Sequence, residues 1–195
     1  MHHIEPYYLW RDYYEAEKDE QSPFFEREYD EFKFTHSIYN YVIHPQWDYI
    51  GSDTLFIKIL YVDYSDGYAI IEMIGEWNDC INNDIMFLKR DVLDHLIHLQ
   101  INKFIMIAEN VLNFHFDIDD YYAEIYEDVE DGWAAVLNLQ EHVEQEFQLH
   151  NMHYYLNFGE KLNIINWRVL KPSDLFHEIK RIIHYSLGTS TEINN

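Results

Sequence analysis

Four side chains of one predicted helix have the types and spacing of metal ligands. His142, Glu146, His150 and His153 recur every three or four residues within 141–157, so a helix would carry three imidazoles and a carboxylate on one face. One helix face does not close a coordination sphere, and the sequence holds no zinc signature and no identifiable partner ligand outside this helix. We therefore predict a solvent-facing row and no metal.

A second set of polar side chains follows three apolar runs that we expect to be parallel strands, at 104–108, 133–139 and 162–170. Ligands of open α/β sheets bind outside the carboxyl ends of such strands. A carboxylate, an imidazole and a guanidinium meeting there could carry out acid–base chemistry on a small polar substrate. Helix capping and loop solvation explain the same side chains without chemistry. The alternative of a small-molecule hydrolase or related enzyme therefore stays open, and its candidate residues are Glu109, Glu141, His142 and Arg168.

No cofactor is expected from the sequence. The six glycines match neither a dinucleotide fingerprint nor a Walker loop nor a nucleophile elbow. Cys80 is the single cysteine, so an internal disulfide is impossible.

Acidic side chains give the strongest pattern in the chain. The 195 residues carry 36 acids against 13 bases, a formal net charge of −23, and no Lys or Arg occurs in 104–159. Such runs commonly solvate the outer faces of helices, but they also attract basic partners. We predict a binding or interaction module that uses this acidic face, whose residues are Asp117, Asp119, Asp120, Glu124, Glu127, Asp128, Glu130 and Asp131.

The same charge excludes several partners. It repels phosphate backbones and anionic membrane surfaces, and no Lys/Arg stripe opposes it, so neither nucleic acid nor a membrane is an expected partner. The first twenty residues lack the basic flank and apolar run of a signal peptide, which makes a soluble, cytoplasmic protein the expectation.

Apolar patterning then predicts the elements that position these side chains. A hairpin at 55–77 turns at Asp66-Gly67, and afterwards helices at 89–100, 119–131, 141–157 and 173–187 alternate with the three runs named above. This order favours an α/β layered domain with a mixed, largely parallel sheet and helices on its faces. In a competing interpretation 121–139 is a second hairpin that turns at Asp131-Gly132.

The chain ends differ from this alternating region. We expect a single domain over 1–195, on which 1–35 packs as an acidic, aromatic extension with helices at 6–19 and 23–30, and a frayed tail at 188–195. The extension is dense in aromatic side chains, which serve either to dock it onto its own sheet or to form a surface for self-association or a partner. They are Tyr7, Tyr8, Trp10, Tyr13, Tyr14, Phe24 and Phe25.

Overall fold

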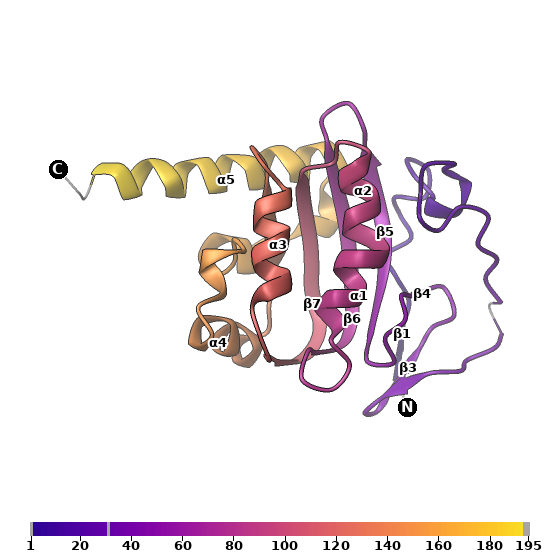
Figure 1. Cartoon of the computed structure of the whole chain (residues 1–195). Helices are drawn as coiled ribbons and strands as arrows, with labels where there is room; N and C mark the ends of the chain where they lie inside the picture. Colours follow the sequence, from indigo (N-terminus) through magenta and orange to yellow (C-terminus); the bar gives the residue numbers. More distant parts are fainter. Residues whose placement is uncertain (1, 31, 193–195) are drawn as a thin grey trace.

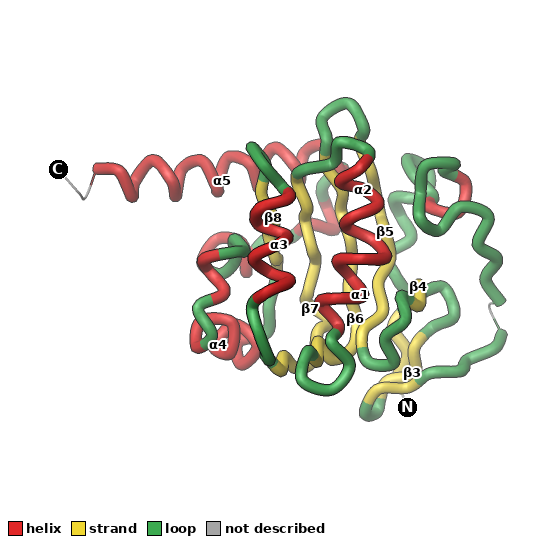
Figure 2. Tube along the Cα trace, viewed as in Figure 1, coloured by secondary structure: helices red, strands yellow, loops and turns green. Residues whose placement is uncertain are grey.

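The computed structural model describes the backbone of residues 2–30 and 32–192 and the side chains of residues 4–30 and 32–185. Its centre is a five-stranded sheet with the order β4-β5-β6-β7-β8 (Figure 2). The strands are β4 (Asp48–Tyr49), β5 (Leu55–Asp63), β6 (Tyr68–Asn78), β7 (Lys103–His115) and β8 (Trp133–Leu137).

The pairing within this sheet confirms the predicted α/β fold with a mixed sheet. β5 and β6 form the expected antiparallel hairpin, and its turn contains Gly67, whose φ of 66° suits a residue without a side chain. β4 is antiparallel to β5, whereas β6, β7 and β8 run parallel to one another. The sheet therefore has two antiparallel and two parallel pairings.

Helices cross over between the parallel strands and cover one face of the sheet, which Figure 1 shows from the front. Between β6 and β7 the chain forms α1 (Asp84–Leu88), the π-helical turn η2 (Lys89–Leu93) and α2 (Asp94–His98), and between β7 and β8 it forms α3 (Asp120–Asp128). Tyr122, Ile125 and Val129 are buried at helical spacing, which fixes 120–128 as a helix. The alternative of a second hairpin at 121–139 is therefore wrong.

The opposite face is covered by α5 (Pro172–Glu192), which extends beyond the edge of the sheet in Figure 1. Among the described residues no helix is both long enough and apolar enough to cross a membrane. The helix continues past the predicted end at residue 187, and the last part of the predicted tail, 193–195, lies outside the described residues.

The predicted strand at 162–170 is wrong. This segment forms two 3₁₀ helices, η4 (Glu160–Ile164) and η5 (Trp167–Val169). Leu162 and Trp167 are buried but Ile164 is 80% and Val169 73% exposed, so burial does not alternate as it does in a strand. The helix predicted at 141–157 is also shorter: α4 (Glu141–Leu149) ends where Asn151 takes a left-handed φ of 56°, and η3 (Met152–Tyr154) follows.

The N-terminal segment packs on the sheet, but the predicted helices at 6–19 and 23–30 do not form. Residues 5–30 make turns and one 3₁₀ helix, η1 (Ala16–Lys18). The Tyr7 N–H donates to the Glu72 carboxylate at 2.8 Å, and Trp10 Nε1 donates to the Leu170 carbonyl at 3.1 Å. These tertiary contacts prevail over the helical spacing of the aromatic side chains.

A small second sheet completes the fold. It has the order β1-β3-β2, with β1 (His2–Ile4), β3 (Tyr41–Ile43) and β2 (Ser37–Ile38). The single-domain organisation of the chain stays a prediction.

Candidate binding groove

Two of the four predicted strand-end residues, Glu109 and Arg168, are in contact. The Arg168 guanidinium contacts the Glu109 carboxylate, and its Nη2 lies 3.6 Å from Glu72 Oε1. Trp167 Nε1 also donates to Glu109 Oε2 at 3.3 Å. The sequence predicts Arg168 at the end of a strand, but Arg168 lies in the 3₁₀ helix η5. The two residues still meet, although the predicted strand that would bring Arg168 there does not form.

Glu72 was missed as a member of this cluster. It sits on β6, is completely buried and interrupts the most apolar stretch of the sequence, which was the available signal. Burial raises the pKa of Glu72 to about 7, an effect that the Tyr7 N–H and the Arg168 guanidinium partly offset. The cluster thus contains a carboxyl group that changes its protonation near neutral pH.

Glu141 and His142 lie elsewhere. Glu141 is the exposed first residue of α4, and His142 Nε2 donates to the Leu112 carbonyl at 2.7 Å. The four candidate catalytic residues are therefore not brought together. The hydrolase alternative loses the geometry on which it depended.

The histidine row is divided between two elements. α4 ends at Leu149, so His153 lies in η3, and His150 stacks on Phe116 with ring centroids 4.5 Å apart. In the described part of the chain no three His, Cys, Asp or Glu side chains are grouped to hold a metal ion.

The acidic face is partly neutralised, which corrects the picture of an uncompensated surface. Lys89, whose side chain is only 1% exposed, contacts Asp94 and lies 2.6 Å from Asp128 Oδ2. Arg90 Nη2 lies 2.8 Å from Glu124 Oε2. Asp119 accepts a hydrogen bond from the Tyr155 hydroxyl. The exposed acids of this face that have no ion pair among the described residues are Asp117, Asp119, Asp120, Glu127, Glu130 and Asp131.

Lys89→Met tests this neutralisation. We expect it to lower the free energy of unfolding by about 1–3 kcal/mol, because Asp94 and Asp128 lose a cation that is itself shielded from water. Arg90→Met is the matched control, with a much smaller loss, since the Arg90 side chain is 48% exposed. Urea titration of both variants measures the difference, and equal losses would contradict the special role of Lys89.

A cavity of about 910 Å³ opens beside the edge strand β8, and we call it the β8 groove. Its walls come from the end of α3, the start of β8, residues 153–157 and the middle of α5. Asn157 holds the wall to the sheet, since its N–H donates to the Ala134 carbonyl at 2.9 Å and its carbonyl accepts from the Val136 N–H at 2.8 Å. Tyr126 and Tyr154 line the groove although they are 60% and 65% exposed, so their rings are accessible to a ligand.

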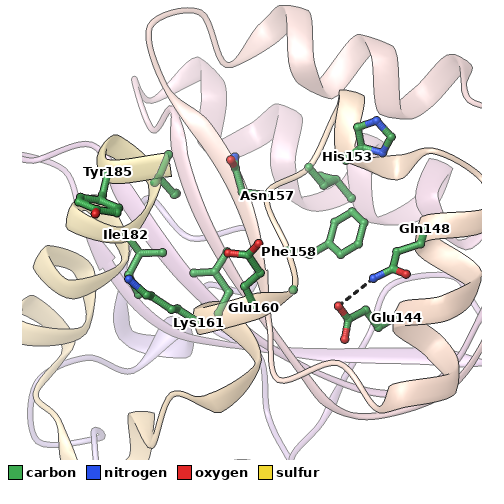
Figure 3. A pocket seen from close by; sticks show the side chains of 13 residues that line it. Glu144, Gln148, His153, Asn157, Phe158, Glu160, Lys161, Ile182 and Tyr185 are labelled. Atoms are coloured by element: carbon green, nitrogen blue, oxygen red, sulfur yellow. Dashed lines mark hydrogen bonds between the residues drawn. The ribbon is translucent and has the colours of Figure 1, made fainter. Parts of the chain in front are cut away.

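A smaller cavity of about 540 Å³ adjoins the groove, because His153, Leu156 and Asn157 line both. Figure 3 shows this smaller cavity. It lies between α4, η4 and α5. Glu144 accepts hydrogen bonds there from Gln148 Nε2 at 3.1 Å and from Asn163 Nδ2 at 2.6 Å. These hydrogen bonds occupy the Glu144 carboxylate, and we take the larger groove as the candidate site.

The β8 groove has an acidic side and a basic side. Glu127, Glu130 and Asp131, all from the predicted acidic face, line it at the end of α3. Lys103 and Lys180 line it at β7 and α5. This lysine pair could not be predicted from the sequence, because Lys103 and Lys180 are distant in the chain and stand on different elements.

The aromatic N-terminal cluster is divided between core and surface. Trp10 and Phe24 are buried, whereas Tyr8, Tyr13 and Phe25 are exposed. Trp10 packs on Trp167 with ring centroids 5.5 Å apart, so part of the cluster docks the segment onto its own sheet. A role of the exposed side chains in self-association or partner binding stays a prediction.

Comparison with known proteins gives only distant structural likenesses. No protein-family model matches the sequence. No curated protein matches it significantly. The structure of a putative anti-sigma factor antagonist from Thermotoga maritima is similar over 64% of this chain and 92% of its own, with 16% identity and a TM-score of 0.42.

The anti-sigma factor antagonist SpoIIAA in its unphosphorylated form is similar over 54% of this chain and 89% of its own, with 12% identity and a TM-score of 0.40. The Bacillus cell fate determinant SpoIIAA in its phosphorylated form is similar over 54% of this chain and 92% of its own, with 9% identity and a TM-score of 0.37. Likenesses at these TM-scores do not establish a function for this chain.

Proposed function

We propose that the protein is an interaction module that binds a basic segment of a partner protein in the β8 groove. The observation that carries this proposal is the acidic side of the groove. Glu127, Glu130 and Asp131 line a cavity of about 910 Å³ and form no ion pair among the described residues. The net charge of −23 adds a long-range attraction that speeds the encounter with a basic partner.

The aromatic side chains of the groove suit the same partner. The rings of Tyr126 and Tyr154 are exposed beside the three carboxylates. An arginine side chain can stack its planar guanidinium on a tyrosine ring while donating to a carboxylate. We therefore expect arginine to be preferred over lysine in the bound segment.

A short peptide of alternating arginine and glycine, carrying a fluorophore at its N-terminus, tests the proposal by fluorescence anisotropy. The triple variant E127Q, E130Q, D131N should weaken binding about tenfold, because three exposed charge pairs contribute about 0.5 kcal/mol each. Asparagine also tolerates the positive φ of 60° at position 131, so the backbone is preserved.

A second triple variant, D117N, D120N and E141Q, is the matched control. It removes the same charge from exposed positions outside the groove, and we expect it to change the dissociation constant less than twofold. If both triple variants weaken binding equally, the peptide senses only the net charge and the groove is not its site.

Self-association is a second candidate. Tyr8 and Tyr13 are 57% and 54% exposed within one short segment, and Leu9 between them is also exposed. Such an apolar patch is typical of contact surfaces. Light scattering of Leu9→Asp beside the unchanged protein tests it: a dimer that the substitution dissociates would support this candidate, and a monomer at all concentrations would exclude it.

A further inference from the structure

The basic side of the β8 groove is formed by Lys103 and Lys180. Several cations of the described residues form ion pairs, as Lys89 does with Asp128 at 2.6 Å and Arg90 with Glu124 at 2.8 Å. Neither Lys103 nor Lys180 forms an ion pair with a carboxylate of the described residues, although Lys103 lies in the field of Asp66. Lys103 Nζ instead donates to the Asp66 carbonyl at 3.2 Å and to Asn102 Oδ1 at 2.7 Å.

The two lysines are close together in space. Lys103 is the register partner of Trp133, Trp133 stacks on Phe176 with ring centroids 6.1 Å apart, and Lys180 Nζ lies 5.7 Å from the centroid of the Phe176 ring. Burial and the nearby Lys180 ammonium lower the pKa of Lys103, an effect that the Asp66 carboxylate partly offsets. His184, one turn after Lys180, lines the same side. Two cations that repel each other favour an anion between them.

The backbone of β7 and β8 is tightly packed beside this pair. A Cβ placed on Gly132 would lie 1.7 Å from the Asn102 carbonyl oxygen, so the starts of β7 and β8 touch without a gap. Lys103 Nζ rests on the β5–β6 turn through its bond to Asp66.

We propose that Lys103 and Lys180 bind the C-terminal carboxylate of the partner segment, which thus ends in the β8 groove with its basic side chains toward α3. The inference rests on the proposed function, because it assigns the end of the same bound segment. Both parts follow from charge complementarity: the acidic side of the groove takes cations and the basic side takes the one anion that every unmodified chain end supplies.

The test compares the arginine–glycine peptide with a free C-terminal carboxylate and the same peptide with a C-terminal amide. The free acid should bind about tenfold more tightly. Non-specific attraction predicts the opposite order, because an amide removes a negative charge that the acidic protein repels. The sign of the difference is therefore diagnostic.

Protein variants test whether the lysine pair causes this difference between the two peptides. Lys180→Gln should remove most of the difference between acid and amide, and it should tighten binding of the amide slightly, because it removes a positive charge that repels a basic peptide. Lys171→Gln, an equal charge change at an exposed site outside the groove, should preserve the difference. The triple variant E127Q, E130Q, D131N should weaken both peptides alike.

Three results would overturn the inference, and they are distinguishable. If acid and amide bind equally and both respond to the triple variant, the carboxylate inference fails while the proposed function stands. If neither peptide responds to the triple variant, the proposed function fails as well. If an amidated peptide with glutamate as its last residue binds as tightly as the free acid, the lysine pair takes a side-chain carboxylate instead of a chain end.

Discussion

The free energy of unfolding is expected to fall by about 2 kcal/mol between about pH 5.5 and about pH 8.5 through Glu72 alone. Burial raises the pKa of Glu72 to about 7 from its ordinary value of 4.5. Between these two values the folded chain holds the proton and the unfolded chain does not, so proton binding favours folding. This stability is complete below the unfolded pKa and is lost as the pH rises through about 7.

The substitution Glu72→Gln isolates this contribution. The amide has no proton to lose, so its unfolding free energy should depend less steeply on pH, while the remaining dependence reflects other groups such as Asp79, whose pKa burial raises to about 6. Urea titrations of both proteins at several pH values above the pI of about 4.6 give the comparison. Glu141→Gln, at an exposed position, should retain the full fall. An equally steep fall in the Glu72→Gln variant would show that this carboxyl group does not titrate in the range.

Gly132→Ala is expected to lower the free energy of unfolding by more than about 3 kcal/mol and the melting temperature by about 10 °C. The new Cβ would lie 1.7 Å from the Asn102 carbonyl oxygen, which also accepts the Trp133 N–H at 3.0 Å. A backbone carbonyl cannot relieve the clash by changing rotamer as a side chain can, so the first residues of β8 must separate from β7.

Gly67→Ala gives the matched comparison at the same place in the fold. Its Cβ would lie 3.0 Å from the Gln100 carbonyl and its φ is 66°, so we expect a cost of about 1 kcal/mol. Thermal unfolding followed by circular dichroism ranks the two variants. A Gly132→Ala variant as stable as Gly67→Ala would mean that β8 starts elsewhere than at Trp133.

The alternating part of the chain was predictable because its buried side chains follow a single period. The hairpin at 55–77, the helix at 120–128 and the strand at 133–137 all follow their apolar patterns. The segment at 162–170 was not predictable in this way, because its apolar residues are divided between the core and solvent. The N-terminal segment satisfies its polar groups with Glu72 and Leu170, which are distant in the sequence.

The candidate site was predictable only where its residues are neighbours in the sequence. Glu127, Glu130 and Asp131 were named from local charge, and they do line the groove. Lys89 lies on Asp128, and Lys103 lies close to Lys180, through tertiary packing. Such pairs leave no local pattern, so the sequence alone overstated the negative charge of one face and missed the positive charge of the other side.

The two ends of the chain close one face of the sheet together. Trp10 and Trp167 pack edge to face, Tyr7 donates its hydroxyl to the Arg168 carbonyl at 2.7 Å, and both segments lie over Tyr68, Ile70 and Ile105. During synthesis Tyr7 and Trp10 leave the ribosome early, whereas Trp167 and Arg168, which pack against them, leave it late. Until then a nascent chain exposes an apolar surface in the middle of its largest sheet, which makes the interval before release the period when this protein most needs protection from aggregation.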